Sequence, residues 1–258
     1  MLASLSSRRS FFQRCSVAVI RATLSLLAVL AVSADAGAQY REPLQLSNEE
    51  LLHGLDQYAF APFGSKTEGY LVRWKGDIRI GITNGGGYVR GMAGFMAKEI
   101  AIIRELTHLD VKFVDKQANV GMVFTDGTQA DFEKYKGLLI QLALDENAQT
   151  ALYKSLVGGG LPCVGKILVS NKKEIAFYLF FVSAQAQDQS KLKQCVFREL
   201  MRSLGLLHFN VPNPVSQDDL DKLRNTAHAL LAFLYQNDVP AGLSRSEVVK
   251  ILAAHASK

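Results

Sequence analysis

The 258-residue chain has few of the residues that carry strong functional signals. It contains three cysteines, and its five histidines include no pair at the H-x-x-x-H spacing of a zinc-binding helix. No G-x-S-x-G segment and no Walker lysine are present. These absences give no support to a serine hydrolase or a P-loop nucleotide-binding protein, and no cofactor is expected.

A glycine triplet, Gly85-Gly86-Gly87, lies between a predicted strand and a predicted helix. A dinucleotide-binding loop of the G-x-G-x-x-G type needs a further glycine where this chain has Arg90. We therefore interpret the triplet as a turn.

Only one long hydrophobic run is present, at residues 22–34, and it is too short to span a bilayer. It follows a basic segment with four arginines and precedes Ala36-Gly37-Ala38, a small-x-small cleavage signal. Residues 1–38 are thus predicted to be an export signal, which places the mature protein in the periplasm or outside the cell. Residues 7–13 resemble the twin-arginine signal, and an ordinary Sec signal is the alternative.

Removal of residues 1–38 takes away four Arg and one Asp, a net charge of +3, so that +2 of the original +5 remains on 220 residues. This small excess gives no support to nucleic-acid binding. A chain of this length can bury one core, and no second hydrophobic run could anchor the mature chain in a membrane.

The mature chain keeps two cysteines, Cys163 and Cys195. In an oxidising compartment two cysteines favour one disulfide, and two buried free thiols are the alternative.

Hydrophobic periodicity predicts an α+β domain with a mixed sheet. A capping box at Ser47 and Glu50 begins a short helix, and a second one at Ser244 and Glu247 begins the last helix. The strand at 174–183 is apolar on both faces and is expected at the centre of the sheet. The other predicted strands cover 71–82, 110–115, 119–124 and 164–170, and the other helices cover 89–107, 129–156, 190–207 and 217–236.

The helix at 190–207 carries Glu199, Gly205 and His208 at the spacings of the zinc-protease motif H-E-x-x-H-x-x-G-x-x-H. Arg198 and Arg202 replace its first two histidines. A guanidinium has only donors and stays protonated, so it cannot bind a metal ion. The segment resembles the active-site helix of a zincin that lacks the usual zinc site, so no metal is expected.

Three segments resemble a bacterial family of exported proteins, domain of unknown function 2927. They are Leu71-Val72-Arg73-Trp74, the helix segment from Cys195 to Leu206, and the tail containing Leu230 to Tyr235 and Pro240 to Glu247. The resemblance implies a zincin-like (metzincin-type) fold over residues 68–258, a backing helix and two C-terminal helices, with residues 39–67 as an N-terminal segment. The chain departs from the family pattern at Arg198, Arg202, His208 and Phe209.

Three hypotheses remain for the polar face of this helix. It is a solvated surface, an anion-binding site formed by Arg198, Arg202 and His208, or a catalytic site in which Glu199 acts as an acid or base. Glu199 lies three residues before Arg202 and is expected to pair with it. The leading hypothesis is a non-catalytic envelope protein that binds an anionic ligand or a protein partner. The alternatives are an active hydrolase and a purely structural component of an envelope complex.

Overall fold

The computed structural model describes residues 45–60, 69–142, 144–158, 163–183, 188–212 and 215–255. The predicted export signal at residues 1–38, with its cleavage site, lies outside these residues, as do residues 39–44 and 61–68.

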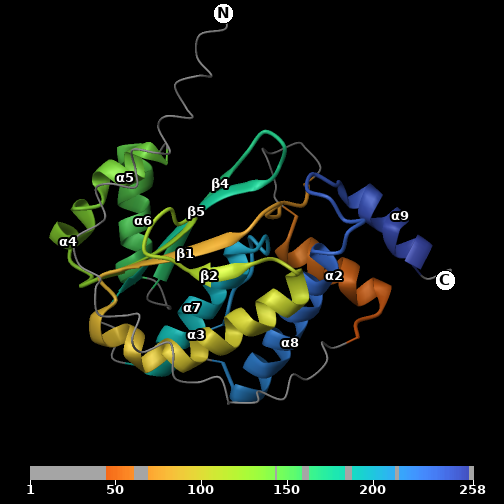
Figure 1. The fold of residues 1–258 in the computed structure, drawn as a ribbon, viewed down its shortest axis with the longest axis horizontal. Coiled ribbons are helices and arrows are strands. Elements are labelled where there is room, and N and C mark those ends of the chain that lie inside the picture. The colour runs from red at the N-terminus through yellow and green to blue at the C-terminus, as the bar shows by residue number, and fades with distance from the viewer. Residues whose placement is uncertain are drawn as a thin grey trace, which may run out of the picture.

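A five-stranded mixed sheet forms the centre of the molecule (Figure 1). Its strand order is β2-β1-β3-β5-β4, and only β4 runs antiparallel to its neighbour. The prediction that the apolar strand at 174–183 lies inside the sheet is confirmed, because β5 pairs with both β3 and β4. The strands are β1 (Ile78–Thr83), β2 (Val111–Phe113), β3 (Val120–Thr125), β4 (Cys163–Val169) and β5 (Ile175–Ser183).

Helices cover both faces of the sheet, so that the described chain forms one α+β domain (Figure 1). On one face, α7 (Gln189–Ser203) packs against β4 and β5, with α3 (Gly86–Thr107) beside it and α8 (Gln217–Leu234) against α3. On the other face, α6 (Glu146–Gly158) packs against β4 and β5. The remaining helices are α2 (Asn48–Tyr58), α4 (Gln129–Glu133), α5 (Lys136–Gln141) and α9 (Arg245–His255).

Two hydrophobic cores correspond to the two faces of the sheet. The larger core joins the sheet to α2, α3, α7 and α8 and contains Phe180, Phe197 and Phe209, all fully buried. The smaller core joins β3 and β5 to α4–α6 around Phe181 and Phe132. Alternate residues of β5 therefore enter different cores, as the period-two geometry of a strand requires. This explains why the strand is apolar on both faces.

The N-terminal segment contributes to the larger core. Ser47 and Glu50 form the predicted capping box of α2, and Leu55 on this helix is completely buried. Asn48 donates a hydrogen bond to the Leu252 carbonyl of α9 at 2.8 Å. The second predicted capping box is also present, since the Glu247 carboxylate accepts from the backbone N–H of Ser244 at 2.8 Å.

The motif helix α7 ends at Ser203, four residues earlier than the sequence pattern indicates. Gly205 adopts a positive φ of 107°, and Leu206 donates its N–H to the Met201 carbonyl at 3.2 Å. This is the Schellman arrangement that closes a helix with a left-handed residue, usually glycine. A Cβ on Gly205 would also lie 2.3 Å from the Val72 carbonyl oxygen, so only glycine fits.

The three segments that carry the family resemblance meet at this helix end. Trp74 donates from its indole to the Ser203 carbonyl at 2.7 Å, and the Tyr235 hydroxyl donates to the Leu204 carbonyl at 3.0 Å. Arg73 donates to the carbonyls that end α8, including that of Leu234 at 2.8 Å. Side chains from two distant segments thus satisfy carbonyl groups that helix ends leave unpaired. The junction fixes the end of α7 relative to the sheet.

Two other predicted elements differ in detail. The strand predicted at 71–82 begins only at Ile78, because Leu71 pairs through its backbone with Leu243 and Gly242 in the tail segment. The helical region predicted at 129–156 is divided into α4, α5 and α6, and the side chain of Asp145 accepts from the Ala148 N–H at the start of α6.

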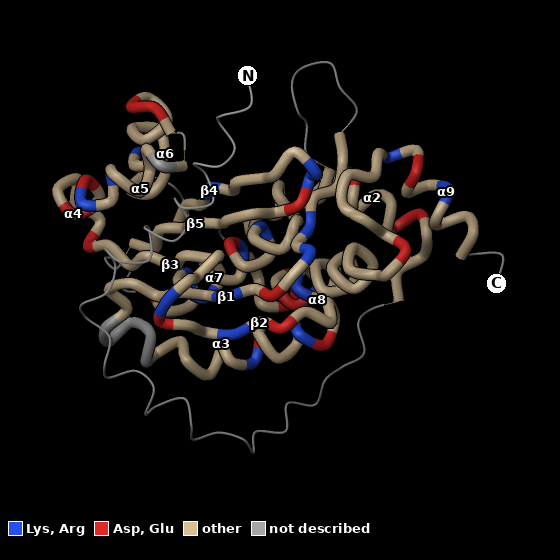
Figure 2. Tube along the Cα trace, turned by 45° about the horizontal axis from the view of Figure 1, so that its top comes forward, with Lys and Arg blue, Asp and Glu red and all other residues tan. Residues whose placement is uncertain are grey.

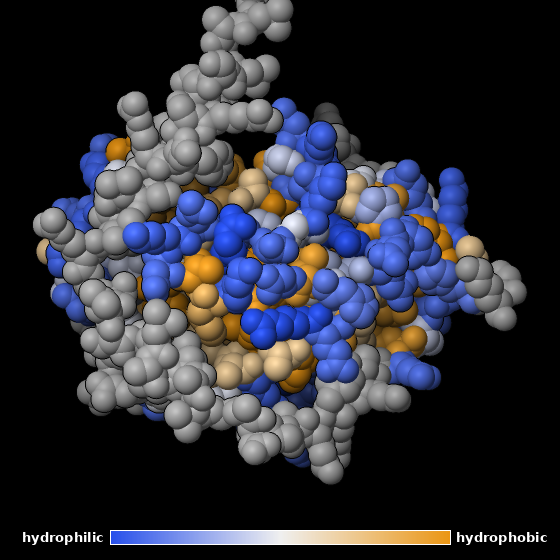
Figure 3. Space-filling view, in the orientation of Figure 1, coloured by the Kyte–Doolittle hydropathy of each residue, from blue (hydrophilic) through white to orange (hydrophobic). Residues whose placement is uncertain are grey.

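Charges of both signs are interspersed along the described chain, with no long stretch of one sign (Figure 2). On the face seen in Figure 3, hydrophilic side chains surround small apolar patches. Within the described ranges, no helix combines the length and apolar character that a membrane crossing requires.

Candidate functional site

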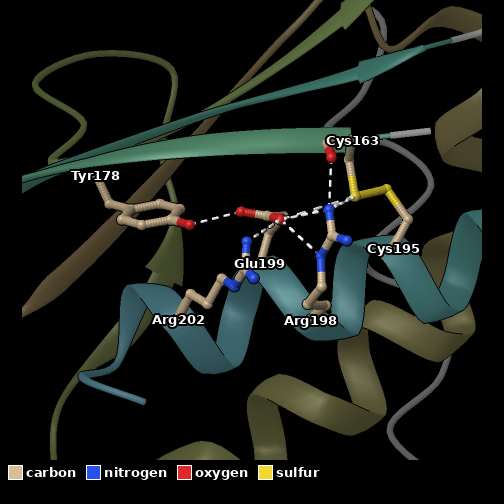
Figure 4. Close-up of a disulfide and its surroundings, with 6 residues drawn as sticks. All are labelled: Cys163, Tyr178, Cys195, Arg198, Glu199 and Arg202. Atoms are coloured by element: carbon tan, nitrogen blue, oxygen red, sulfur yellow. Dashed lines mark hydrogen bonds and ion pairs between the residues drawn. A yellow bond between two sulfur atoms is a disulfide. The ribbon is translucent and has the colours of Figure 1, made fainter. Parts of the chain in front are cut away.

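The candidate site lies between α7 and the β4–β5 hairpin. Arg198, Glu199 and Arg202 extend from α7 toward the sheet, and Tyr178 extends from β5 to meet them (Figure 4). Asp188 begins the helix by accepting hydrogen bonds from the N–H groups of Ser190 and Lys191. This cap fixes the start of α7, and the turn at Gly205 fixes its end. Together they orient the helix so that the three polar residues lie beneath the strands.

Glu199 is at the centre of the cluster and its side chain is completely inaccessible to solvent. One carboxylate oxygen accepts from Arg198 Nε at 2.9 Å and lies 3.4 Å from Arg202 Nη1. The other accepts from the Tyr178 hydroxyl at 2.5 Å. The predicted pairing of Glu199 with Arg202 is therefore confirmed. Both carboxylate oxygens are occupied by donors from the protein.

The two arginines also hold backbone carbonyls at either end of the cluster. Arg198 donates from Nη2 to the carbonyl oxygen of Cys163, at the start of β4. Arg202 donates from Nε to the Phe209 carbonyl at 2.7 Å. The Arg198 side chain is 11% exposed and that of Arg202 is 26% exposed. Arg202 is thus the more open of the two to solvent.

A disulfide joins Cys163 of β4 to Cys195 of α7, with a Cα–Cα distance of 5.8 Å that is usual for such a bond. The predicted disulfide is confirmed, and the alternative of two free thiols is wrong. Cys195 lies one helical turn before Glu199, and Cys163 Sγ is 4.0 Å from a carboxylate oxygen of Glu199. The covalent bond therefore holds the edge strand β4 against the part of α7 that carries the ion cluster (Figure 4).

Gly165 leaves the space that the cluster occupies. A Cβ at this position of β4 would lie 2.2 Å from the Tyr178 hydroxyl oxygen and 2.4 Å from Glu199 Oε2. Such distances are too short for any side chain, so the strand can pass over the cluster only with glycine here. Neither Gly165 nor Tyr178 was predicted as a site residue from the sequence. An isolated glycine inside a strand pattern was the available signal, since it marks a close approach of other atoms.

The phenol of Tyr178 is a donor at ordinary pH. Its pKa is raised well above the usual value, first because the side chain is completely buried and then because the Glu199 carboxylate opposes a second negative charge beside it. The cluster therefore contains two positive guanidinium groups, one carboxylate and a neutral phenol.

His208 lies outside this cluster. Its side chain is exposed, and its backbone N–H donates to the Tyr58 carbonyl at 2.9 Å. α7 ends at Ser203, so His208 is not part of the helix. Its sequence spacing from Arg202 therefore does not bring it onto the helix face that carries Arg202.

Zinc does not fit the residues at the positions of the motif. The two positions that need imidazole carry Arg198 and Arg202, whose guanidinium groups have no lone pair for a cation. In the part of the chain that the structure describes, no group of three His, Cys, Asp or Glu side chains is arranged to hold a metal ion. The cluster is an ion-pair network in which two guanidinium groups and a phenol surround one carboxylate.

A second buried ion pair provides a contrast. Between α3 and α8, Glu99 lies 3.3 Å from Arg224 Nε and 3.3 Å from His228 Nε2. Arg224 there faces the buried Glu99 and also lies 3.4 Å from the more exposed Asp221, so carboxylates are not outnumbered by arginines. At the α7 cluster two arginines share a single carboxylate, and the charges do not balance.

The fold and this site define an α+β protein in which a disulfide clamps an edge strand over a buried arginine–glutamate–tyrosine cluster. Residues 57–254 match the model of the family described as protein of unknown function (DUF2927), which covers more than half of the chain. The chain belongs to this family, and the predicted resemblance is confirmed. No curated protein and no solved structure matches the chain.

Proposed function

We propose that this chain is an exported, non-catalytic protein of the cell envelope that binds an anionic group at Arg198 and Arg202. The observation that carries the proposal is the charge imbalance of the cluster: two guanidinium groups share one carboxylate, and the less buried of them, Arg202, is 26% exposed. A partly buried positive charge that is not neutralised by its neighbours attracts an anion more strongly than a fully solvated positive charge does.

The terminal nitrogens of the arginines supply donors for such a group. Arg198 uses Nε and Nη2, and Arg202 uses Nε and Nη1, for contacts within the described part of the chain. Nη1 of Arg198 and Nη2 of Arg202 have no hydrogen-bond partner among these residues. Neither nitrogen is one of the solvent-inaccessible polar atoms that lack a hydrogen-bond partner. Both nitrogens are available to oxygens of a carboxylate or phosphate group.

A hydrolytic role for Glu199 has less support. A general base must come within hydrogen-bond distance of the proton that it removes. The Glu199 carboxylate is completely buried and occupied by Tyr178 and both arginines. We therefore place the catalytic alternative second, and a purely structural envelope protein third.

The rest of the proposal concerns scaffold and compartment. A zincin-like origin is supported by the order of elements and by the position of α7 beneath the sheet, with Glu199 and Gly205 at the motif spacings. Export is supported by the signal-like residues 1–38 and by the Cys163–Cys195 disulfide, a bond that persists in oxidising compartments.

The test is a titration of the oxidised protein with acetate, followed through the arginine side-chain N–H signals in NMR spectra. We expect saturable binding that weakens with added salt, and a loss of about tenfold or more in affinity for Arg202→Gln. Arg245→Gln is the matched control, because it removes the same charge from an arginine that pairs with Asp56 on the surface far from the cluster in sequence. Equal affinity in the wild type and Arg202→Gln would refute the anion site.

A further inference from the structure

The charge of the cluster determines which anions suit it. Arg198 and Arg202 contribute two positive charges and Glu199 one negative charge, so that the cluster has a net charge of +1. Tyr178 adds no charge, since burial and the neighbouring carboxylate raise the pKa of its phenol and keep the proton in place. One bound monoanion brings the assembly to neutrality, whereas a dianion leaves it at −1.

Electrostatic attraction and desolvation depend differently on ligand charge. The attraction between a ligand and a fixed cluster rises in proportion to the charge of the ligand. The cost of removing an ion from water rises with the square of its charge in the Born description. A dianion also brings its second charge close to Glu199, whose side chain has no access to screening solvent. The balance therefore favours a ligand with a single negative charge.

We infer that the Arg198–Arg202 site prefers monoanionic carboxylates, such as an acidic side chain or chain terminus, over dianionic phosphate groups. The inference rests on the proposed function and specifies the class of ligand for the same site. Two nitrogens, Arg198 Nη1 and Arg202 Nη2, have no hydrogen-bond partner among the described residues, and each can donate to a carboxylate oxygen.

The charge arithmetic also assigns a role to Glu199 in this preference. Glu199 is not expected to touch the ligand, because it is buried beneath the arginines and already satisfied by Tyr178. It acts as a positioning residue that sets both the orientation of the guanidinium groups and the net charge. Glu199→Gln keeps the shape of the side chain and raises the net charge of the cluster from +1 to +2.

The experiment compares acetate with methyl phosphate on the full oxidised chain, at about pH 5.5 and about pH 8. Methyl phosphate changes from mainly monoanionic to dianionic across this interval, since the second pKa of phosphate monoesters is about 6. Acetate is charged at both pH values and corrects for any change in the charge of the protein between them. The ratio of the dissociation constants at the two pH values is measured for each ligand, and the ratio for methyl phosphate is divided by that for acetate. We expect the corrected result to show methyl phosphate binding at least about tenfold more weakly at the higher pH.

Each outcome has a definite meaning. Methyl phosphate that binds equally or more tightly as a dianion would overturn the inference and leave the anion site intact. Absence of binding by both anions would overturn the proposed function together with the inference. Glu199→Gln provides a second measurement if its thermal transition remains cooperative: the preference for the monoanion should shrink or reverse. An unchanged preference in this variant would contradict the charge argument even if the wild type behaved as expected.

Discussion

The Tyr178 hydroxyl donates to the Glu199 carboxylate at 2.5 Å, and both groups lie in the space where a side chain at Gly165 would be. A strand, a helix and a glycine on the neighbouring strand thus form one unit, which the disulfide fastens at its edge. The unit holds a negative charge out of water, and it does so by surrounding that charge with two arginines and a phenol.

Gly165→Ala tests the close approach directly. The added Cβ would lie 2.2 Å from the Tyr178 hydroxyl oxygen, so either the strand or the phenol must move. Overpacking of this kind costs about 1–3 kcal/mol, to be measured as a loss of unfolding free energy in denaturant. Gly94→Ala is the control, because nothing lies within 4 Å of its Cβ on helix α3, and this change should be neutral or stabilising by up to about 1 kcal/mol. Equal effects of the two substitutions would contradict the packing described for β4.

The raised pKa of Tyr178 predicts a loss of stability at alkaline pH. The folded state keeps the phenolic proton more tightly than the unfolded state, whose tyrosines titrate near the usual value of about 10. The stabilisation is therefore complete below about pH 10 and is lost as the pH rises above it. Tyr135, with a pKa of about 12, and Tyr235, with a raised pKa, contribute in the same direction.

Tyr178→Phe separates this residue from the other tyrosines. It should cost about 1–3 kcal/mol near neutral pH, because one oxygen of Glu199 loses its donor. Above about pH 10 the free energy of unfolding should fall less steeply with pH than in the wild type. The measurement is a series of denaturant transitions at increasing pH, and identical slopes for the two proteins would exclude Tyr178 as a source of the alkaline effect.

Glu199→Ala should be among the most damaging single substitutions. It leaves two arginines facing a buried void without their shared carboxylate, and removal of one member of a buried ion pair typically costs about 3–5 kcal/mol. Glu247→Ala is the matched control, since its carboxylate caps α9 at an exposed position and should cost about 1 kcal/mol. Comparable losses in thermal or denaturant unfolding would show that the cluster is less important than its burial indicates.

The disulfide gives a prediction for protein purified without reductant. Intact mass after alkylation without reductant should show no modified thiol at Cys163 or Cys195, and two after reduction. The half-cystines are 32 residues apart, so the bond should add about 3–4 kcal/mol to the free energy of unfolding, because it lowers the conformational entropy of the unfolded chain. Replacement of both cysteines by serine should reduce the unfolding free energy by about that amount, and alkylation of both thiols in unreduced protein would disprove the bond.

Much of the fold could be predicted because the local signals agreed with the tertiary structure. The apolar run of β5, the capping boxes at Ser47 and Ser244, and the cysteine count each depend on a short stretch of sequence or on composition. Helix ends were less predictable. Gly205 signals the end of α7, but the apolar pattern continues to Leu207 because these residues remain in contact with the core after the helix has ended.

The candidate site could be predicted only in part. The spacing of Glu199 and Arg202 on one helix predicted their ion pair, since neighbours on a helix surface are fixed by its geometry. The burial of Glu199 could not be predicted from that spacing, because it depends on Tyr178 and Gly165 in strands that only the sheet register brings above α7. A polar helix face that resembles solvated surface in the sequence is thus covered by a strand in the folded protein.

Elemental analysis for zinc tests the central claim most directly, namely that Arg198, Glu199 and Arg202 form an ion cluster that does not hold a metal ion. The sample is the full protein purified from its own compartment, without added metal and without chelator. We expect zinc far below one equivalent per chain, unchanged in Glu199→Gln, because guanidinium groups cannot ligate a cation. One equivalent of zinc that survives dialysis and is lost in Glu199→Gln would contradict the account.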